Sequence, residues 1–180
     1  VGNECRRLRE KVGVIDLTPF TKFEVTGPGA EGWLDSLVAN KVPTKVGRIA
    51  LCHALTQRGG IRSEFTITKL ADHHYYVVSA GAAERYDSDF LQKRLPTDGS
   101  VALRNITGSR GVFVLAGPRA RDVMAKLTDV PLDNASFPWL TGQVIEAGLA
   151  TDVYALRVNF VGALGWELHF PIEYAHGLFD

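Results

Sequence analysis

The chain is organised around the stretch Arg58-Gly59-Gly60-Ile61-Arg62-Ser63-Glu64-Phe65-Thr66-Ile67-Thr68. Its Gly-Gly pair predicts a tight turn, because glycine reaches positive φ without a Cβ clash. After the turn, apolar and polar residues alternate, which predicts a β-strand. One side of that strand would carry Ile61, Ser63, Phe65 and Ile67, and the other Arg62, Glu64, Thr66 and Thr68. Glu64 then either meets a ligand amine or is a solvated carboxylate at a strand edge, and this segment alone favours the solvated carboxylate.

Composition places the chain among soluble globular proteins. Of its 180 residues, 46% are hydrophobic and 22% are charged, and the formal net charge is zero, so no overall field directs it to nucleic acid or to an anionic membrane. Cys5 and Cys52 lie far apart with no CxxC pattern, which suits a reducing compartment. No apolar run reaches the roughly 18 residues that a membrane helix needs. We expect a cytoplasmic protein, or one of the mitochondrial matrix in a eukaryote, with no metal, nucleic-acid or membrane partner.

The pattern of elements predicts an α+β fold with largely antiparallel sheets and flanking helices, because strands are many and no βαβ alternation is visible. Helices are predicted at 1–12, 30–38 and 82–95. Strands are predicted at 14–17, 21–26, 49–55, 61–68, 74–79, 101–106, 111–116 and 143–146. Both ends read as helices that are cut, so we expect the chain to be a piece of a longer polypeptide. Trp33 and Trp139 are expected in the core.

Two segments share one arrangement. Phe23-x-Val25-x-Gly27-Pro28-x-Ala30 and Phe113-x-Leu115-x-Gly117-Pro118-x-Ala120 each read as strand, Gly-Pro turn and helix. This similarity suggests an internal duplication with two related halves. A subdivision is expected near 96–110, within a single domain that covers residues 1–180.

A second glycine turn resembles the first. Residues 154–161 and 166–170 alternate on either side of Gly162-Ala163-Leu164-Gly165, which predicts a hairpin with Glu167 just past its turn. Phe160 and Trp166 lie near this acid. An aromatic wall and a carboxylate that accepts two N–H bonds suit a flat heterocycle with amine and lactam edges. A second acid near a reacting amine, such as Glu64, would stabilise developing positive charge.

Several other kinds of chemistry are excluded by their missing motifs. Gly108-Ser109-Arg110-Gly111 lacks a third glycine and precedes a strand, so FAD or NAD binding within this chain is not expected. The Walker A, HExxH and GxSxG patterns are absent. Cys52 and His53 are adjacent in a strand and point to opposite faces, which predicts a core cysteine beside a half-exposed histidine.

The segments 14–30, 55–61 and 157–168 resemble the folate-binding aminomethyltransferase domain, a family that includes the T-protein of the glycine cleavage system. Within this family, the sequence is more similar to the C-terminal part of dimethylglycine and sarcosine dehydrogenases or oxidases. The residues that carry this similarity are Val14-Ile15-Asp16-Leu17-Thr18-Pro19, Leu55-Thr56-Gln57-Arg58-Gly59-Gly60 and Gly162-Ala163-Leu164-Gly165-Trp166-Glu167-Leu168. The resemblance spans nearly the whole chain in the correct order.

This resemblance implies tetrahydrofolate binding and one-carbon transfer by an enzyme, with a methylated amine or aminomethyl donor as its other small-molecule partner. It implies that Glu64 acts beside the folate nitrogens and that Glu167 holds the pterin edge. Phe160, Trp166 and Gly60 are the further folate-binding residues expected. FAD would belong only to a fused flavin domain upstream, and the C-terminal barrel of the family would lie beyond Asp180.

The chain departs from the family pattern at three positions. Glu64 stands where aspartate is frequent, Ser63 replaces a companion acid of T-proteins, and Phe160 replaces the usual tyrosine. Two alternatives to an enzyme therefore stay open: a non-catalytic folate-binding or regulatory domain, and a structural domain that has lost folate.

Overall fold

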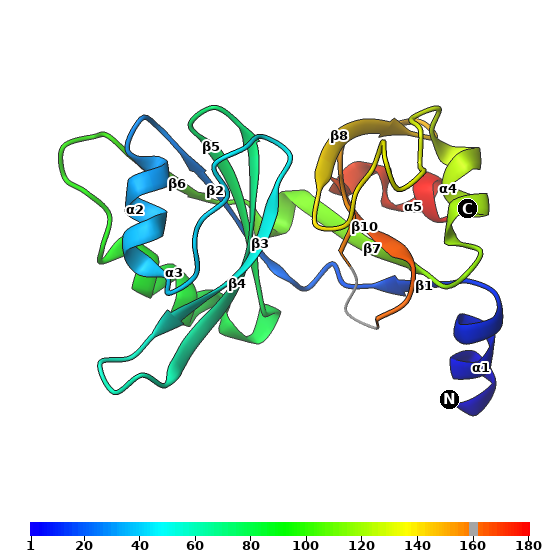
Figure 1. Cartoon of the computed structure of the whole chain (residues 1–180), viewed down its shortest axis with the longest axis horizontal. Coiled ribbons are helices and arrows are strands. Elements are labelled where there is room, and N and C mark those ends of the chain that lie inside the picture. Colours follow the sequence, from blue (N-terminus) through cyan, green and yellow to red (C-terminus); the bar gives the residue numbers. More distant parts are fainter. Residues whose placement is uncertain (159–161) are drawn as a thin grey trace. The chain divides into compact units, whose positions relative to one another are not determined.

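The computed structural model describes residues 1–158 and 162–180, and Phe160 lies outside the described residues. The chain forms two compact units (Figure 1). Unit 2 consists of residues 19–107, and unit 1 is assembled from two separate segments, 1–18 and 108–180. Each unit has its own five-stranded antiparallel sheet and its own apolar core. The prediction of an α+β fold with antiparallel sheets and flanking helices is confirmed.

The sheet of unit 2 has the strand order β3-β4-β5-β2-β6. The strands are β2 (Thr21–Thr26), β3 (Ile49–Leu55), β4 (Ile61–Ala71), β5 (His74–Ser79) and β6 (Ala102–Asn105). Helices α2 (Ala30–Leu37) and α3 (Glu84–Gln92), with the short 3-10 helix η1 (Gly81–Ala83) before α3, lie on one face of this sheet (Figure 1). Alternate strand residues such as Phe65 and Ile67 pack there against the apolar sides of both helices.

The sheet of unit 1 has the order β1-β7-β10-β9-β8. Its strands are β1 (Gly13–Asp16), β7 (Arg110–Ala116), β8 (Gly142–Ala147), β9 (Ala150–Leu156) and β10 (Gly165–Pro171). The helices are α1 (Gly2–Glu10), α4 (Ala120–Leu127) and α5 (Ala175–Phe179), and 3-10 turns occur at η2 (Thr107–Ser109) and η3 (Ile172–Tyr174). Met124 of α4 packs with Trp166, Leu168 and Phe170 of β10 in the core.

The two Gly-Pro turns have the same geometry, one in each unit. Gly27 has φ +114°, and a Cβ there would lie 2.4 Å from the carbonyl oxygen of Ser100. Gly117 has φ +128°, and a Cβ there would lie 2.6 Å from the carbonyl oxygen of Lys11. Only glycine fits both the backbone angle and the close approach. Each turn leads into an eight-residue helix, so the predicted strand, turn and helix occur in both units.

Two local expectations are wrong. Trp139 is 52% exposed, because it lies in the loop that precedes β8 rather than in an element that faces the core. A β-bulge at the start of β4 pairs Ala54 with Ser63 and Leu55 with Ile61, which leaves Arg62 as the extra residue. The side chains of Arg62 and Ser63 therefore do not point to opposite faces of the sheet, as strict alternation predicts. Both contact residues of helix α3. Trp33 is buried as expected.

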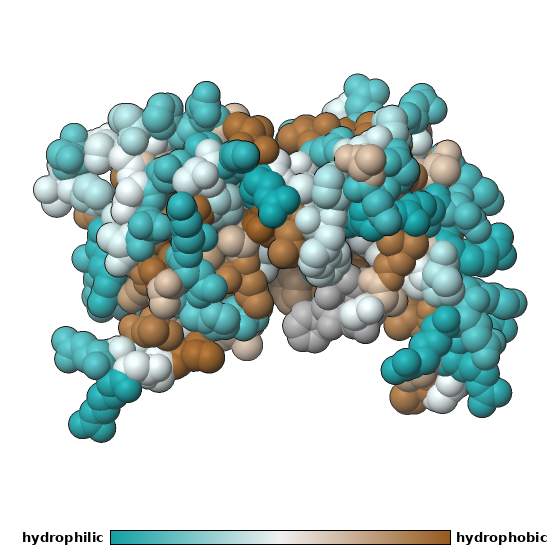
Figure 2. All heavy atoms as spheres, in the orientation of Figure 1, coloured by the Kyte–Doolittle hydropathy of each residue, from teal (hydrophilic) through white to brown (hydrophobic). Residues whose placement is uncertain are grey.

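The β3–β4 hairpin extends far beyond the rest of its sheet (Figure 1). Figure 2 shows a hydrophilic tip with hydrophobic spheres just behind it. The exposed large apolar residues of the hairpin are Leu51, Leu55 and Ile61. No helix in residues 1–158 or 162–180 combines the length and the apolar character that spanning a bilayer requires.

A buried lysine ties α2 to the sheet of unit 2. Lys69 is 8% exposed, and its Nζ donates to Glu31 Oε2 at 2.9 Å. The Tyr75 hydroxyl donates to the same oxygen at 2.6 Å. The hydrogen bond from Tyr75, and then the one from Lys69, lower the pKa of Glu31 below its ordinary 4.5. Burial, followed by the bond to Glu31, raises the pKa of Tyr75 to about 12.

We predict that Tyr75→Phe lowers the free energy of unfolding by about 1 kcal/mol at pH 7, because one hydrogen bond to a carboxylate is lost. Because the folded pKa of Glu31 is lowered, the stability due to its ionised form is present above 4.5 and is lost as the pH falls through the folded value. The difference between wild type and variant should therefore shrink below pH 4.5 in urea titrations. Tyr86→Phe, at a half-exposed tyrosine, is the control and should change little. A Tyr75→Phe effect independent of pH would contradict this role for Glu31.

Candidate functional site

The Gly-Gly turn has the geometry that the sequence predicts. Gly59 has φ +79°, and its N–H donates to the carbonyl of Thr56 at 2.9 Å. Gly60 donates to Thr56 Oγ1 at 3.1 Å, and its carbonyl accepts from the Thr56 N–H at 2.8 Å. Thr56 thus closes the turn through both its backbone and its side chain. These hydrogen bonds fix the backbone of the turn from which β4 begins.

Glu64 lies on the face of β4 that points away from α2 and α3. Its cross-strand partner in the register of β3 is His53, and His53 Nε2 lies 3.0 Å from Glu64 Oε2. The Glu64 side chain is 56% exposed and the His53 side chain 26%. Glu64 is therefore a solvent-accessible carboxylate with one oxygen held by an imidazole. The sequence analysis foresaw a half-exposed His53 but missed its pairing with Glu64, which depends on strand register.

Cys52, the neighbour of His53, points into the core. It is fully buried, and burial, with a smaller contribution from Asp35, raises the pKa of its thiol to about 11. A thiol in this state supplies almost no thiolate near neutral pH. The expectation of a core cysteine beside a half-exposed histidine is confirmed.

Ser63 has a structural partner in unit 2. Its hydroxyl donates to Asp87 Oδ1 of α3 at 2.6 Å, and both side chains are buried. The next residue along β4, Glu64, lies on the opposite face. Ser63 and Glu64 therefore do not form a joint site, and the serine instead satisfies a buried carboxylate.

Glu167 is part of a buried polar cluster on one face of the unit 1 sheet. The residue is 7% exposed, and its Oε2 lies 3.1 Å from Nε2 of the fully buried His169. The two residues are two positions apart on β10 and share a face. Tyr154, opposite His169 in the register of β9, lies on that face as well.

Arg110 completes this polar cluster. Its guanidinium donates to the carbonyls of Asp152, at 2.7 Å, and of His169, at 3.3 Å. It also pairs with the Asp152 carboxylate. The guanidinium carbon lies 3.7 Å from the centre of the Tyr154 ring, which is a cation–π contact. Sequence analysis missed Arg110, Tyr154 and His169, although His169 follows Glu167 at the spacing of one strand face.

Trp166 lies on the other face of β10 from Glu167. It is fully buried in the core of unit 1, with its ring 6.0 Å from that of Phe137. Arg157 lies over the same ring at 5.7 Å, and burial, followed by the nearby Arg121, lowers the pKa of Arg157. The structure thus separates Trp166 from Glu167, against the expectation that both line one ligand. Strand alternation gives the physical reason.

No metal centre is apparent in the described part of the chain, where no three histidine, cysteine or acidic side chains are grouped to hold an ion. Unit 1 offers a buried carboxylate that can accept N–H donors, and unit 2 offers an accessible carboxylate beside an imidazole.

Comparison with known proteins gives one consistent family. The model described as the GCVT N-terminal domain matches residues 1–180. The chain is 35% identical over 181 residues to mitochondrial dimethylglycine dehydrogenase of Rattus norvegicus, an alignment that covers 100% of the chain and 21% of that protein. It is 32% identical over 174 residues to an aminomethyltransferase of Chloroherpeton thalassium, covering 96% of the chain and 47% of that protein.

The fold has a close counterpart among solved structures. The crystal structure of glycine cleavage system aminomethyltransferase T from Bartonella henselae superimposes with a TM-score of 0.85 at 24% identity, over 98% of the chain and 46% of that protein. This confirms the expected T-protein-like fold. The chain spans about a fifth of the dehydrogenase and about half of each aminomethyltransferase.

We predict that Arg110→Lys lowers the free energy of unfolding by about 1–3 kcal/mol, because an ammonium cannot reproduce the planar fork that stacks on Tyr154 and reaches two carbonyls. Denaturant titration of both proteins measures this difference. Arg119→Lys is the matched control, since Arg119 is an exposed partner of Asp122 on α4, and it should change stability by less than about 0.5 kcal/mol. Equal effects of the two substitutions would show that the buried cluster needs no guanidinium.

Proposed function

The chain belongs to the family of GCVT N-terminal domains, and from this premise we propose that it performs tetrahydrofolate-dependent one-carbon transfer. The resemblance drawn from the sequence is confirmed at the level of the family. Its relatives include enzymes, an aminomethyltransferase and a dimethylglycine dehydrogenase. We propose the role of the folate domain of a dehydrogenase-like or T-protein-like enzyme, with a methylated amine or aminomethyl group as the donor.

The observation that carries the proposal is the buried carboxylate of Glu167. An edge of adjacent N–H donors, as on a pterin, needs a carboxylate that accepts two bonds side by side. Glu167 fits, because His169 fixes its orientation within a face from which water is largely excluded. In such surroundings hydrogen bonds to a carboxylate are strong and specific. We propose that Glu167 holds the pterin edge.

Glu64 is the proposed catalytic residue. When bound, tetrahydrofolate supplies two amine nitrogens that take up one carbon at the oxidation level of formaldehyde. The carboxylate of Glu64 would orient a reacting amine, stabilise positive charge as it develops and accept the proton that is released. Its 56% exposed side chain leaves room for a ligand, and His53 holds one oxygen in place.

The other residues of the proposed site have different proposed roles. Gly60 gives the backbone its course before β4. Phe160 is proposed as the aromatic wall from the family pattern alone, since it lies outside the described residues. We assign Trp166 a supporting role behind β10 because of its position in the core.

The same proposal extends to partners. A fused flavin domain would oxidise the amine, and FAD would belong to that domain. The rat relative is named a dimethylglycine dehydrogenase. The rat relative is mitochondrial by name, and we propose the mitochondrial matrix for a eukaryotic source and the cytoplasm otherwise.

We predict that Glu167→Ala weakens tetrahydrofolate binding by the complete protein at least tenfold, because the pterin donors lose their buried acceptor. Isothermal titration calorimetry measures this, and circular dichroism checks the fold of the variant. Glu173→Gln, an exposed glutamate that follows β10, is the control and should bind as the wild type does. Equal affinities of Glu167→Ala and wild type would remove Glu167 from the site.

We predict that Glu64→Gln keeps tetrahydrofolate affinity within about threefold but slows formation of 5,10-methylenetetrahydrofolate by about 10²–10⁴-fold, the range of general acid–base catalysis. Product is measured in single turnovers with a methylated amine donor. Glu24→Gln is a matched control, because Glu24 forms a similar pair with His74 in the same sheet at 3.0 Å. An unchanged rate in Glu64→Gln would rule out the catalytic role. Folate binding without any turnover by the wild type would favour a regulatory domain.

A further inference from the structure

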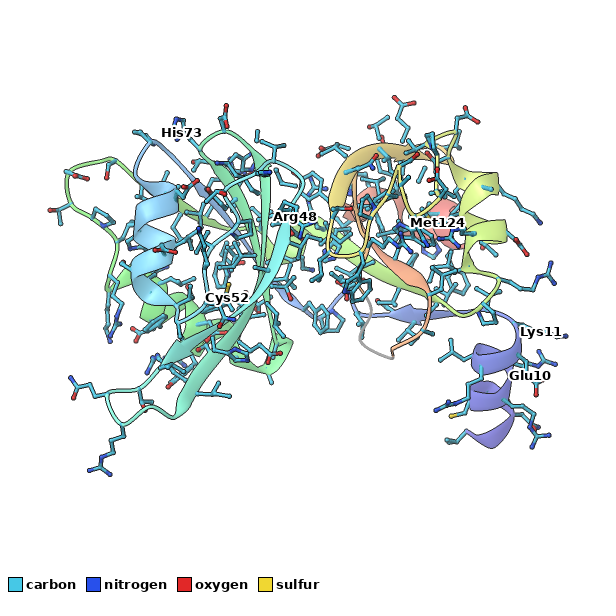
Figure 3. The ribbon with its side chains drawn as sticks, viewed as in Figure 1. Glu10, Lys11, Arg48, Cys52, His73 and Met124 are labelled. Atoms are coloured by element: carbon cyan, nitrogen blue, oxygen red, sulfur yellow. The ribbon has the colours of Figure 1, made fainter. Side chains whose placement is uncertain are left out.

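The imidazole of His53 and the carboxylate of Glu64 form a pair in which the donor and the acceptor are fixed by chemistry. Nε2 of His53 and Oε2 of Glu64 are 3.0 Å apart. An ionised carboxylate only accepts hydrogen bonds, so Nε2 carries the proton and donates it. Figure 3 labels Cys52, which precedes His53 on β3 and belongs to the apolar core. His53 and Glu64 therefore share the face of the sheet that is turned away from that core.

The backbone holds His53 close to Glu64. β3 is the outer strand of its sheet, and the Ala39 N–H donates to the outward carbonyl of His53 at 2.9 Å. Because this carbonyl points away from β4, His53 and Glu64 are a non-hydrogen-bonded pair of the ladder, the arrangement in which opposite side chains lie closest. The imidazole thus projects from a strand that is bonded on both sides.

His53 is the only ion-pair partner of Glu64 in residues 1–158 and 162–180. Arg62, the nearest cation along β4, turns to the other face, where its guanidinium carbon lies 4.2 Å from the ring centre of Tyr86 and 4.5 Å from that of Phe90. The second carboxylate oxygen of Glu64, Oε1, makes no hydrogen bond within the same described residues, and the side chain is 56% exposed. One oxygen is therefore held, and the other is free to accept a proton.

A second pair in the same sheet differs in this respect. His74 Nε2 lies 3.0 Å from Glu24 Oε1, the same separation as between His53 and Glu64. Arg104 Nε lies 3.5 Å from the other oxygen of Glu24, and the Glu24 side chain is only 18% exposed. Both oxygens of Glu24 thus face a cation or an imidazole. The pair of His53 and Glu64 instead combines one fixed oxygen with one accessible oxygen.

We propose that His53 is a positioning residue for the one-carbon transfer. Its N–H fixes Oε2 of Glu64, so that Oε1 is the atom that accepts the proton of the reacting amine. His53 keeps its own proton and acts through Glu64 alone. The inference rests on the proposed function, in which Glu64 is the proton acceptor.

The length of the Glu64 side chain gives the reason for such a partner. A glutamate has one more rotatable bond than the aspartate that is frequent at this position of the family pattern, so an exposed glutamate has more conformations to lose before it can act. Proton transfer requires a base that already lies in the productive geometry. The hydrogen bond from His53 removes the freedom that the extra methylene adds.

The test is a double-mutant cycle on the complete protein, with formation of 5,10-methylenetetrahydrofolate as the readout. His53→Phe should lower kcat on the order of 10- to 100-fold and leave KM for tetrahydrofolate within about threefold, because Glu64 is present but no longer oriented. His53→Gln keeps an N–H donor and should recover most of kcat. In Glu64→Asp the shorter carboxylate withdraws from His53, so adding His53→Phe there should cost less than about threefold.

His74→Phe is the matched control, because it removes the imidazole of the other pair in the same sheet while Glu24 keeps Arg104. It should leave kcat unchanged. Circular dichroism checks that every variant is folded, and phenylalanine suits a strand position.

Two outcomes overturn different claims. If His53→Phe costs nothing, or costs the same with Glu64 and with Glu64→Asp, the positioning role is wrong and the proposed function stands. If the wild type forms no product, the proposed function fails instead. His53 is then judged by nitrogen-15 NMR at mildly alkaline pH, which identifies the ring nitrogen that carries the proton. A proton on Nε2 in the wild type and a mixture of tautomers in Glu64→Ala would support the orientation of Glu64 by His53, and a mixture in both proteins would overturn it.

Discussion

Strand alternation within antiparallel sheets is the constraint on which both candidate sites depend. In β10, the register against β7 and β9 sends Trp166 and Leu168 into the core of unit 1. Glu167 and His169 must then share the opposite face. A slip of one residue would exchange the two sets and bury charge in an apolar core, which is strongly disfavoured. The position of the acid is thus set by apolar neighbours on the same strand that point away from it.

Local sequence patterns predicted most of the fold. Alternation located β3 within its observed bounds, and the turn residues located the β3–β4 hairpin. The strand predicted at 154–161 is observed as β9 at Ala150–Leu156, so its bounds were wrong. The repeated Gly-Pro turns were visible because close backbone approach at Gly27 and Gly117 demands glycine, so the signal depends on sterics rather than on hydrophobicity. Glu64 and Glu167 were identifiable for a similar reason, since each follows a turn that needs specific residues.

The features that the sequence did not predict depend on contacts between segments that are distant in the chain. The pairing of Glu64 with His53 requires the register of two strands, and a bulge at Arg62 shifts that register without any glycine at the bulge itself. Arg110 is far in sequence from its partners Asp152 and His169, so no window of sequence reveals the cluster. Exposure of an aromatic residue in a loop, as at Trp139, is likewise set by tertiary packing.

The interrupted course of unit 1 has a consequence for the order of events during synthesis. β1 pairs with β7, so Gly13 meets Ala116 across 103 positions of chain (116 − 13). All of unit 2 leaves the ribosome between these partners, and its sheet uses only residues within 19–107. Unit 2 can therefore complete its core before β7, the strand that pairs with β1, has been synthesised. Nascent chains of increasing length should gain protease resistance first in the inserted unit, and the unit that encloses it should follow once β10 has emerged.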